Sequence, residues 1–82
     1  MKIGPEYIGN ITLKSLRDFI LDEGLSENDL IILNYRNFEE LVLEFRDFYN
    51  ESLKKPFKIL GVEIQEDNKT PKDRIYLEIE EV

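Results

Sequence analysis

Carboxylates are the side chains that could carry chemistry in this chain, because its 82 residues contain eighteen Asp and Glu but no His and no Cys. Two carboxylates with pKa values pushed apart by a cleft can hydrolyse glycosides. No pair of acids stands out here by its spacing, and a chain of this length has little room for a sugar cleft. A carboxylate-based hydrolase is therefore a remote alternative, and the sequence indicates a protein that is not an enzyme.

Other reactive patterns receive no better support. Serine and threonine hydroxyls need a base, which imidazole commonly supplies, and thiolate or imidazole zinc ligands are absent. The polar stretch 66–73 offers Asp67, Asn68 and Asp73 as oxygen ligands, but it lacks the dense spacing of a calcium loop. The four glycines form no phosphate-binding pattern. We expect no catalytic residues, no metal and no cofactor.

Charge narrows the choice of partner. Eleven Lys and Arg give a formal net charge of -7, which opposes attraction to nucleic-acid phosphates and to anionic lipid. The one basic cluster, Lys54, Lys55 and Lys58, has Phe57 beside it, but solvated lysines at a helix end explain it more simply. The sequence predicts that the partner is a protein, and the negative net charge favours a basic one. Binding to nucleic acid or to a membrane is not expected. Solubility is the plainer explanation of the acidity.

The first marked element is a helix at about 13–23. Thr12 is suited to the N-cap position, apolar residues recur at helical spacing, and Gly24 is suited to a Schellman ending with Leu25. A strand follows at about 30–34. Its four consecutive apolar residues predict a central strand covered on both faces.

A second helix is predicted at about 38–52, with Asn37 as its N-cap. Its apolar side chains fall on one stripe about 120° wide, whereas a strand would not accommodate the last two of them as well. Because so small a domain needs most of its large apolar side chains in the core, the whole stripe is expected to be buried. The stripe contains Phe38, Leu41, Val42, Phe45, Phe48 and Tyr49.

Two strands are predicted at about 57–65 and 74–80, joined as a hairpin by the polar stretch between them. In the first, Leu60, Val62 and Ile64 share one face. In the second, Ile75, Leu77 and Ile79 face inward. The segment 1–11 could form either an extended arm or an edge strand around Tyr7 and Ile8.

The order of these elements predicts one α+β domain over residues 1–82. Both helices are expected on one face of a small, mostly antiparallel sheet of three to four strands.

Two surfaces are candidates for partner binding. The first lies around Leu43, which is on the polar side of the second helix, and includes aromatic and arginine residues of the kind enriched at interfaces. The second is the outward face of the last strand, which could pair with another copy if it lies at the sheet edge. The first consists of Tyr35, Arg36, Glu39, Leu43, Arg46 and Asp47, and the second of Tyr76, Glu78 and Glu80.

The sequence thus favours a small acidic binding module, such as an adaptor, an inhibitor or a subunit of a complex. An alternative is an acidic decoy or immunity-type protein that blocks a basic nucleic-acid-binding or toxin site. The absence of Ala together with abundant Ile, Lys, Asn and Glu is typical of an AT-rich bacterial or phage genome. The start of the chain lacks the pattern of a secretory signal, so a cytoplasmic location is expected.

Overall fold

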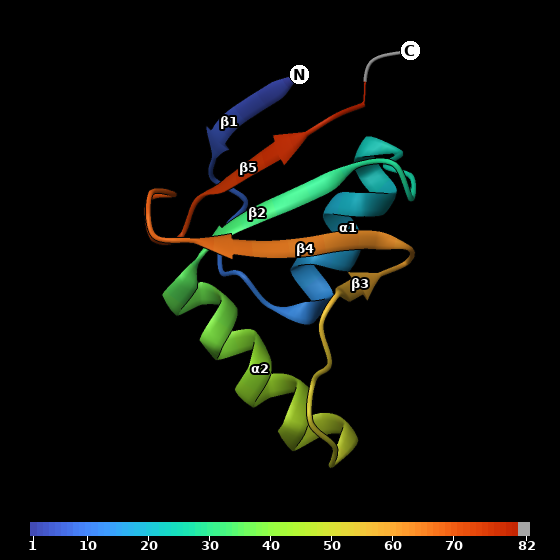
Figure 1. Ribbon diagram of the computed structural model, residues 1–82, viewed down its shortest axis with the longest axis vertical. Helices are drawn as coiled ribbons and strands as arrows, with labels where there is room; N and C mark the ends of the chain where they lie inside the picture. Colours follow the sequence, from blue (N-terminus) through green and yellow to red (C-terminus); the bar gives the residue numbers. More distant parts are fainter. Residues whose placement is uncertain (81–82) are drawn as a thin grey trace.

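The computed structural model describes residues 1–80 as two helices and a five-stranded sheet (Figure 1). The strands run in the order β1-β5-β2-β4-β3, and β2 pairs in parallel with β4 whereas the other neighbours are antiparallel. The α+β class is confirmed, but the sheet is mixed and larger than the predicted three to four strands. The elements are β1 (Lys2–Glu6), α1 (Leu13–Glu23), β2 (Leu30–Asn34), α2 (Tyr35–Tyr49), β3 (Phe57–Ile59), β4 (Val62–Asp67) and β5 (Ile75–Glu78).

Helix α1 has the two ends that the sequence predicts. Thr12 and Ser15 form a capping box, in which each side chain accepts a hydrogen bond from the other residue's backbone N–H. Gly24 adopts a left-handed conformation, and the Leu25 N–H donates to the Ile20 carbonyl at 3.0 Å. Helix and strand can therefore follow each other with only a short turn between them.

Helix α2 begins three residues earlier than predicted. Its N-cap is Asn34, the last residue of β2, whose side chain accepts a hydrogen bond from the Arg36 N–H at 2.9 Å. The predicted N-cap, Asn37, instead lies in the first turn and is 1% exposed. The helix ends at Asn50, which takes a left-handed conformation, so residues 51–52 lie outside it.

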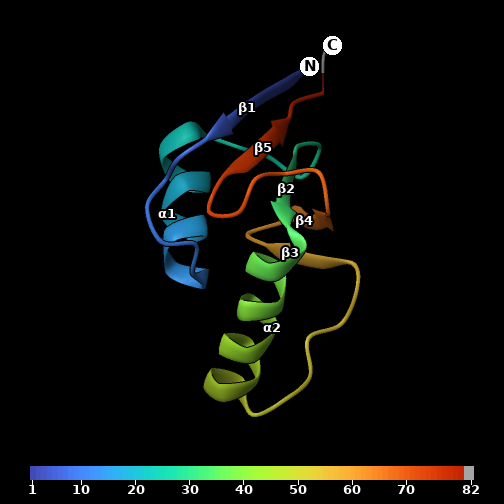
Figure 2. The same ribbon diagram turned by 90° about the vertical axis from the view of Figure 1, so that its left-hand side faces the viewer.

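Strand β2 is central, as predicted, but only one of its faces is covered. Ile31 and Leu33 are fully buried, whereas Leu30 and Ile32 on the opposite face are half-buried. Both helices lie on the side of Ile31 and Leu33 (Figure 2). The four apolar residues misled the prediction because a half-buried aliphatic side chain looks the same in sequence as a buried one.

The predicted strand at 57–65 is in fact two strands, β3 and β4, joined at Leu60 and Gly61. Both residues have positive φ, 49° and 85°, which closes a tight hairpin. Leu60, predicted to share one face with Val62 and Ile64, is 54% exposed at this turn, whereas those two side chains are buried. The turn was not predicted because leucine rarely adopts positive φ, so Leu60 does not indicate a turn in the sequence.

Strands β4 and β5 do not form the predicted hairpin, because β2 lies between them. The loop that connects them is fixed by buried polar groups. The Asn34 side-chain amide donates to the Thr70 carbonyl at 2.8 Å, and Asn37 exchanges two hydrogen bonds with Asp73. The loop therefore lies against the start of α2 instead of reversing the chain onto a paired neighbour.

The edges of the sheet are β1 and β3, so the last strand does not have the edge position that pairing with another copy would require. Strand β1 pairs with β5, with a register irregularity between Ile3 and Glu6. The N-terminal segment is therefore an edge strand, but it lies at Lys2–Glu6 and not around Tyr7 and Ile8 as expected. Pro5 in β1 and the three-residue length of β3 both limit pairing with another chain. The Ile75 and Leu77 side chains face inward as predicted.

Candidate functional site

Helix α2 runs past the sheet, so no strand lies opposite its last turns (Figure 1). The apolar stripe therefore divides into two parts. Phe38 and Leu41, near β2, are 2% and 0% exposed. Phe48 and Tyr49, in the last turn, are 77% and 54% exposed, so the prediction that the whole stripe is buried is wrong.

The exposed rings are joined to the core by successive ring contacts. Phe38 meets Phe57 edge to face at 6.4 Å between centroids, and Phe57 meets Phe45 at 5.7 Å. Phe45 contacts Tyr49 at 4.7 Å, and Tyr49 contacts Phe48 at 5.2 Å. These spacings are those of favourable aromatic pairs. The outer rings thus continue a series of ring contacts that starts in the core.

The outer rings line a hollow of about 480 Å³, which we call the aromatic groove. One wall is the second half of α2, another is the first turns of α1, and the third is the β3–β4 hairpin. The groove lies on the helix side of the molecule, where α2 extends beyond the sheet. Its lining residues are Leu13, Lys14, Arg17, Glu44, Phe45, Phe48, Tyr49, Phe57, Lys58, Ile59 and Leu60.

The charged residues of the aromatic groove are mostly basic. Lys14, Arg17 and Lys58 are exposed, and none of them has an ion-pair partner within residues 1–80. The one acid, Glu44, accepts a hydrogen bond from the Leu13 N–H at 3.0 Å, where the positive end of the α1 dipole lies. The groove therefore carries a local positive charge in a chain of net charge -7.

The first predicted surface is brought together in part. Tyr35, Arg36, Glu39 and Leu43 line a separate hollow of about 360 Å³ with Glu40 and Lys72, which we call the Leu43 hollow. Arg46 and Asp47 are exposed on α2 but do not line it.

Arg36 is already engaged within the Leu43 hollow. Its Nε–H donates to the Tyr35 hydroxyl at 3.1 Å, and this bond raises the pKa of the Arg36 guanidinium. Leu43 is 49% exposed and Tyr35 38%, so the apolar surface here is small compared with that of the aromatic groove.

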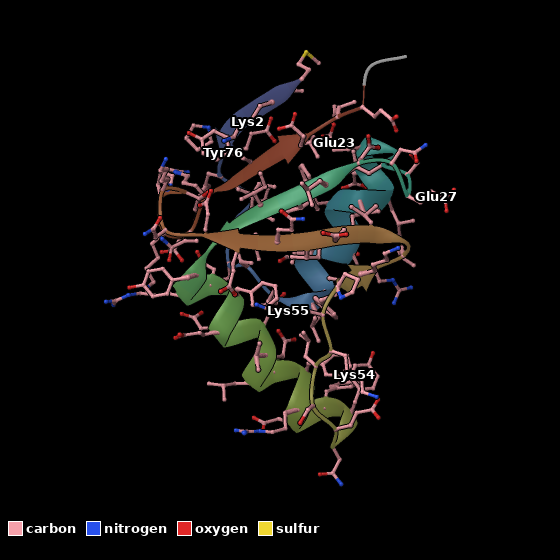
Figure 3. All side chains as sticks on the ribbon, viewed as in Figure 1. Lys2, Glu23, Glu27, Lys54, Lys55 and Tyr76 are labelled. Carbon is pink, nitrogen blue, oxygen red and sulfur yellow. The ribbon has the colours of Figure 1, made fainter. Side chains whose placement is uncertain are left out.

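The second predicted surface lies on the open face of the sheet. Tyr76 is half-buried, and the Lys2 ammonium stands 4.4 Å from the centroid of its ring. Figure 3 labels the two side chains, which lie on the neighbouring strands β1 and β5. Glu78 forms an ion pair with the Met1 amino group at 3.6 Å, and Glu80 is exposed beyond the end of β5. Since β5 is paired on both sides, these residues cannot add a partner strand at its edge.

The basic cluster is partly committed to internal contacts. Lys55 forms an ion pair with Glu66 at 3.8 Å and lies 5.2 Å from the Phe38 ring centroid, beside a shallow hollow of about 430 Å³. Lys54 and Lys55 are both on the segment between α2 and β3 (Figure 3). Within residues 1–80 there is no group of three or more His, Cys, Asp and Glu placed to hold a metal ion. The same part of the chain contains no helix with the length and apolar character needed to cross a membrane.

Comparisons with known proteins give no match: no family model, no curated protein and no solved structure is similar to the chain. The candidate site therefore stands on its geometry.

The aromatic groove was not predicted from the sequence, and the expected lengths of the elements gave no signal for it. A fifteen-residue helix spans about 22 Å, whereas the strand expected at 57–65 would span about 30 Å and could cover it.

Proposed function

We propose that this protein is a small non-catalytic binding module that docks a protein partner in the aromatic groove. The observation that carries the proposal is the 77% exposure of Phe48 at the end of a ring stack that starts in the core. Contiguous exposed apolar patches with a polar rim are typical of interaction sites. Such a module could serve as an adaptor, an inhibitor or a subunit.

Preorganisation supports this use of the groove. Tyr49 contacts both Phe45 and Phe48, so the outer rings lose little rotamer freedom when a partner covers them. Aromatic side chains of this kind often dominate binding free energy, especially near the centre of an interface. Phe48 and Tyr49 are therefore the expected anchors, and Leu60 across the groove is a secondary contact.

Affinity capture from an extract of the native host tests the proposal. The baits are the wild type, Phe48→Ser and, as a matched surface control, Leu43→Ser, each first shown to be folded by circular dichroism. We expect one partner to be retained by the wild type and by Leu43→Ser and to be lost with Phe48→Ser.

Three outcomes would contradict the proposal. Equal capture by all three baits would show that the partner binds neither in the aromatic groove nor in the Leu43 hollow. Loss with Leu43→Ser alone would place the site in the Leu43 hollow. Failure of the wild type to retain any protein would remove support for a binding module.

A further inference from the structure

We infer that the occupant of the aromatic groove is an acidic polypeptide segment that carries large apolar side chains. The inference rests on the proposed function and deepens it by naming the chemistry of the partner. It departs from the expectation based on net charge, which predicts a basic partner for the chain as a whole. The local charge of the groove matters more than the net charge of the chain, because the Debye length is about 8 Å at physiological ionic strength.

The basic residues of the groove are available to a partner. Lys14 and Arg17 lie one turn apart on α1, both exposed and neither ion-paired in the described part of the chain. The Glu44 carboxylate opposite them is occupied by the Leu13 N–H. Carboxylates of a bound segment would meet these cations, and its apolar side chains would meet the outer rings. An arginine beside an apolar floor suits such a contact, since it can pair with a carboxylate in bidentate geometry.

A second copy of this chain is a poorer occupant. Two copies related by a twofold axis that face each other through this groove would place one basic rim near the other. The local charge would oppose their association.

A fatty-acid anion is also a poorer fit, although it combines the same charge and apolarity. Small-molecule sites usually enclose most of their ligand. Phe48 and Tyr49 are instead mostly exposed, so a chain laid across them would keep one side in water. A polypeptide can cover the rings and place its own polar backbone outward.

Selection from a library of short random peptides displayed on phage tests the inference. The wild type is the target, and Phe48→Ser is the counter-target that removes peptides bound elsewhere. We expect the enriched peptides to combine Asp or Glu with Leu, Ile, Phe or Trp. An enriched set that is neutral or basic, yet dependent on Phe48, would overturn the acidic partner and leave the docking site standing.

The best selected peptide is then synthesised with a fluorescent label, and its Kd for variants of the protein measures the electrostatic contribution to binding. Lys14→Glu combined with Arg17→Glu is expected to raise Kd roughly tenfold or more, since it replaces attraction with repulsion. The control is Lys69→Glu with Lys72→Glu, which changes the net charge equally on the β4–β5 loop and should leave Kd within about twofold. Equal effects of the two double variants would overturn the inference.

One further outcome would overturn both the inference and the proposed function, namely that no Phe48-dependent peptide is selected. If laurate then shifts the NMR signals of the Phe48 and Tyr49 amides, the groove is a site for an apolar anion instead.

Discussion

Phe38 and Phe48 lie on the same stripe of the same helix, yet one is 2% and the other 77% exposed. We expect Phe38→Ala to lower the free energy of unfolding by about 3–5 kcal/mol, because it leaves a cavity between α2 and the sheet. Phe48→Ala should change it by no more than about 0.5 kcal/mol, since it removes only surface contacts and alanine favours the helix. Urea unfolding of both variants checks this. A loss of several kcal/mol in Phe48→Ala would mean that the ring supports the fold and is not reserved for a partner.

Among single residues, Asp67 is expected to make the free energy of unfolding depend on pH. Its Oδ1 accepts hydrogen bonds from the Thr70 hydroxyl at 2.6 Å and the Thr70 N–H at 2.8 Å, and these bonds lower the pKa of the Asp67 carboxyl below its ordinary value of 3.8. A folded pKa below the unfolded one means that the ionised form stabilises the fold above the unfolded pKa. This contribution is lost as the pH falls through the folded pKa.

The measurement is urea unfolding of the wild type and Asp67→Asn at pH 7 and at about pH 3. We expect the gap between the two proteins to be largest at pH 7 and to shrink at the acid end, because asparagine cannot carry the charge. A gap that stays constant with pH would show that only the hydrogen bonds, and not the ionisation, matter at this position. Lys69 also donates its N–H to this carboxylate, so the same variant should loosen the β4–β5 loop.

At the scale of elements, the outer strand β1 depends on a close approach to β5. Gly4 has φ +121°, and a Cβ added there would lie 2.7 Å from the Ile75 carbonyl oxygen. Gly9 also has positive φ, but a Cβ there meets nothing within 4 Å. The two glycines therefore separate the effect of a clash from the effect of backbone strain.

We expect Gly4→Ala to lower the free energy of unfolding by about 3 kcal/mol, and Gly9→Ala by about 1 kcal/mol. Amide hydrogen exchange adds a local readout, because the Ile79 N–H donates to the Met1 carbonyl at 2.8 Å. That amide should exchange faster in Gly4→Ala than in Gly9→Ala. Equal destabilisation by the two variants would mean that β1 can shift away from β5 without loss.

At the scale of the whole molecule, the fold offers no long, flat sheet edge through which two copies could associate. Its two edges are a strand that contains Pro5 and a strand of three residues, and the chain carries a net charge of -7. We expect light scattering to give the monomer mass of 9.8 kDa at both low and high concentration. A dimer that Phe48→Ser dissociates would show that a second copy fills the aromatic groove.

Local interactions made part of this structure predictable. The Thr12 N-cap, the Gly24 ending and the inward alternation of Ile75 and Leu77 depend on residues close in sequence, and the α+β class followed from such local patterns. The first residue of α2 was harder to predict, because Asn34 and Asn37 are equally suitable N-caps by residue type. The choice between them depends on Asp73 and Thr70, which lie thirty-six residues away and hold the Asn37 and Asn34 side chains.

The sequence by itself thus determined the two helices to within about three residues, the α+β class, the acidity and the lack of histidine and cysteine. Only the tertiary structure decided the strand order, the interior position of β5 and the division of the aromatic stripe into core and groove. The physical reason is that burial is a property of what lies opposite a side chain. A period of 3.6 residues places Phe38 and Phe48 on one face, but only the extent of the sheet determines where that face stops being covered.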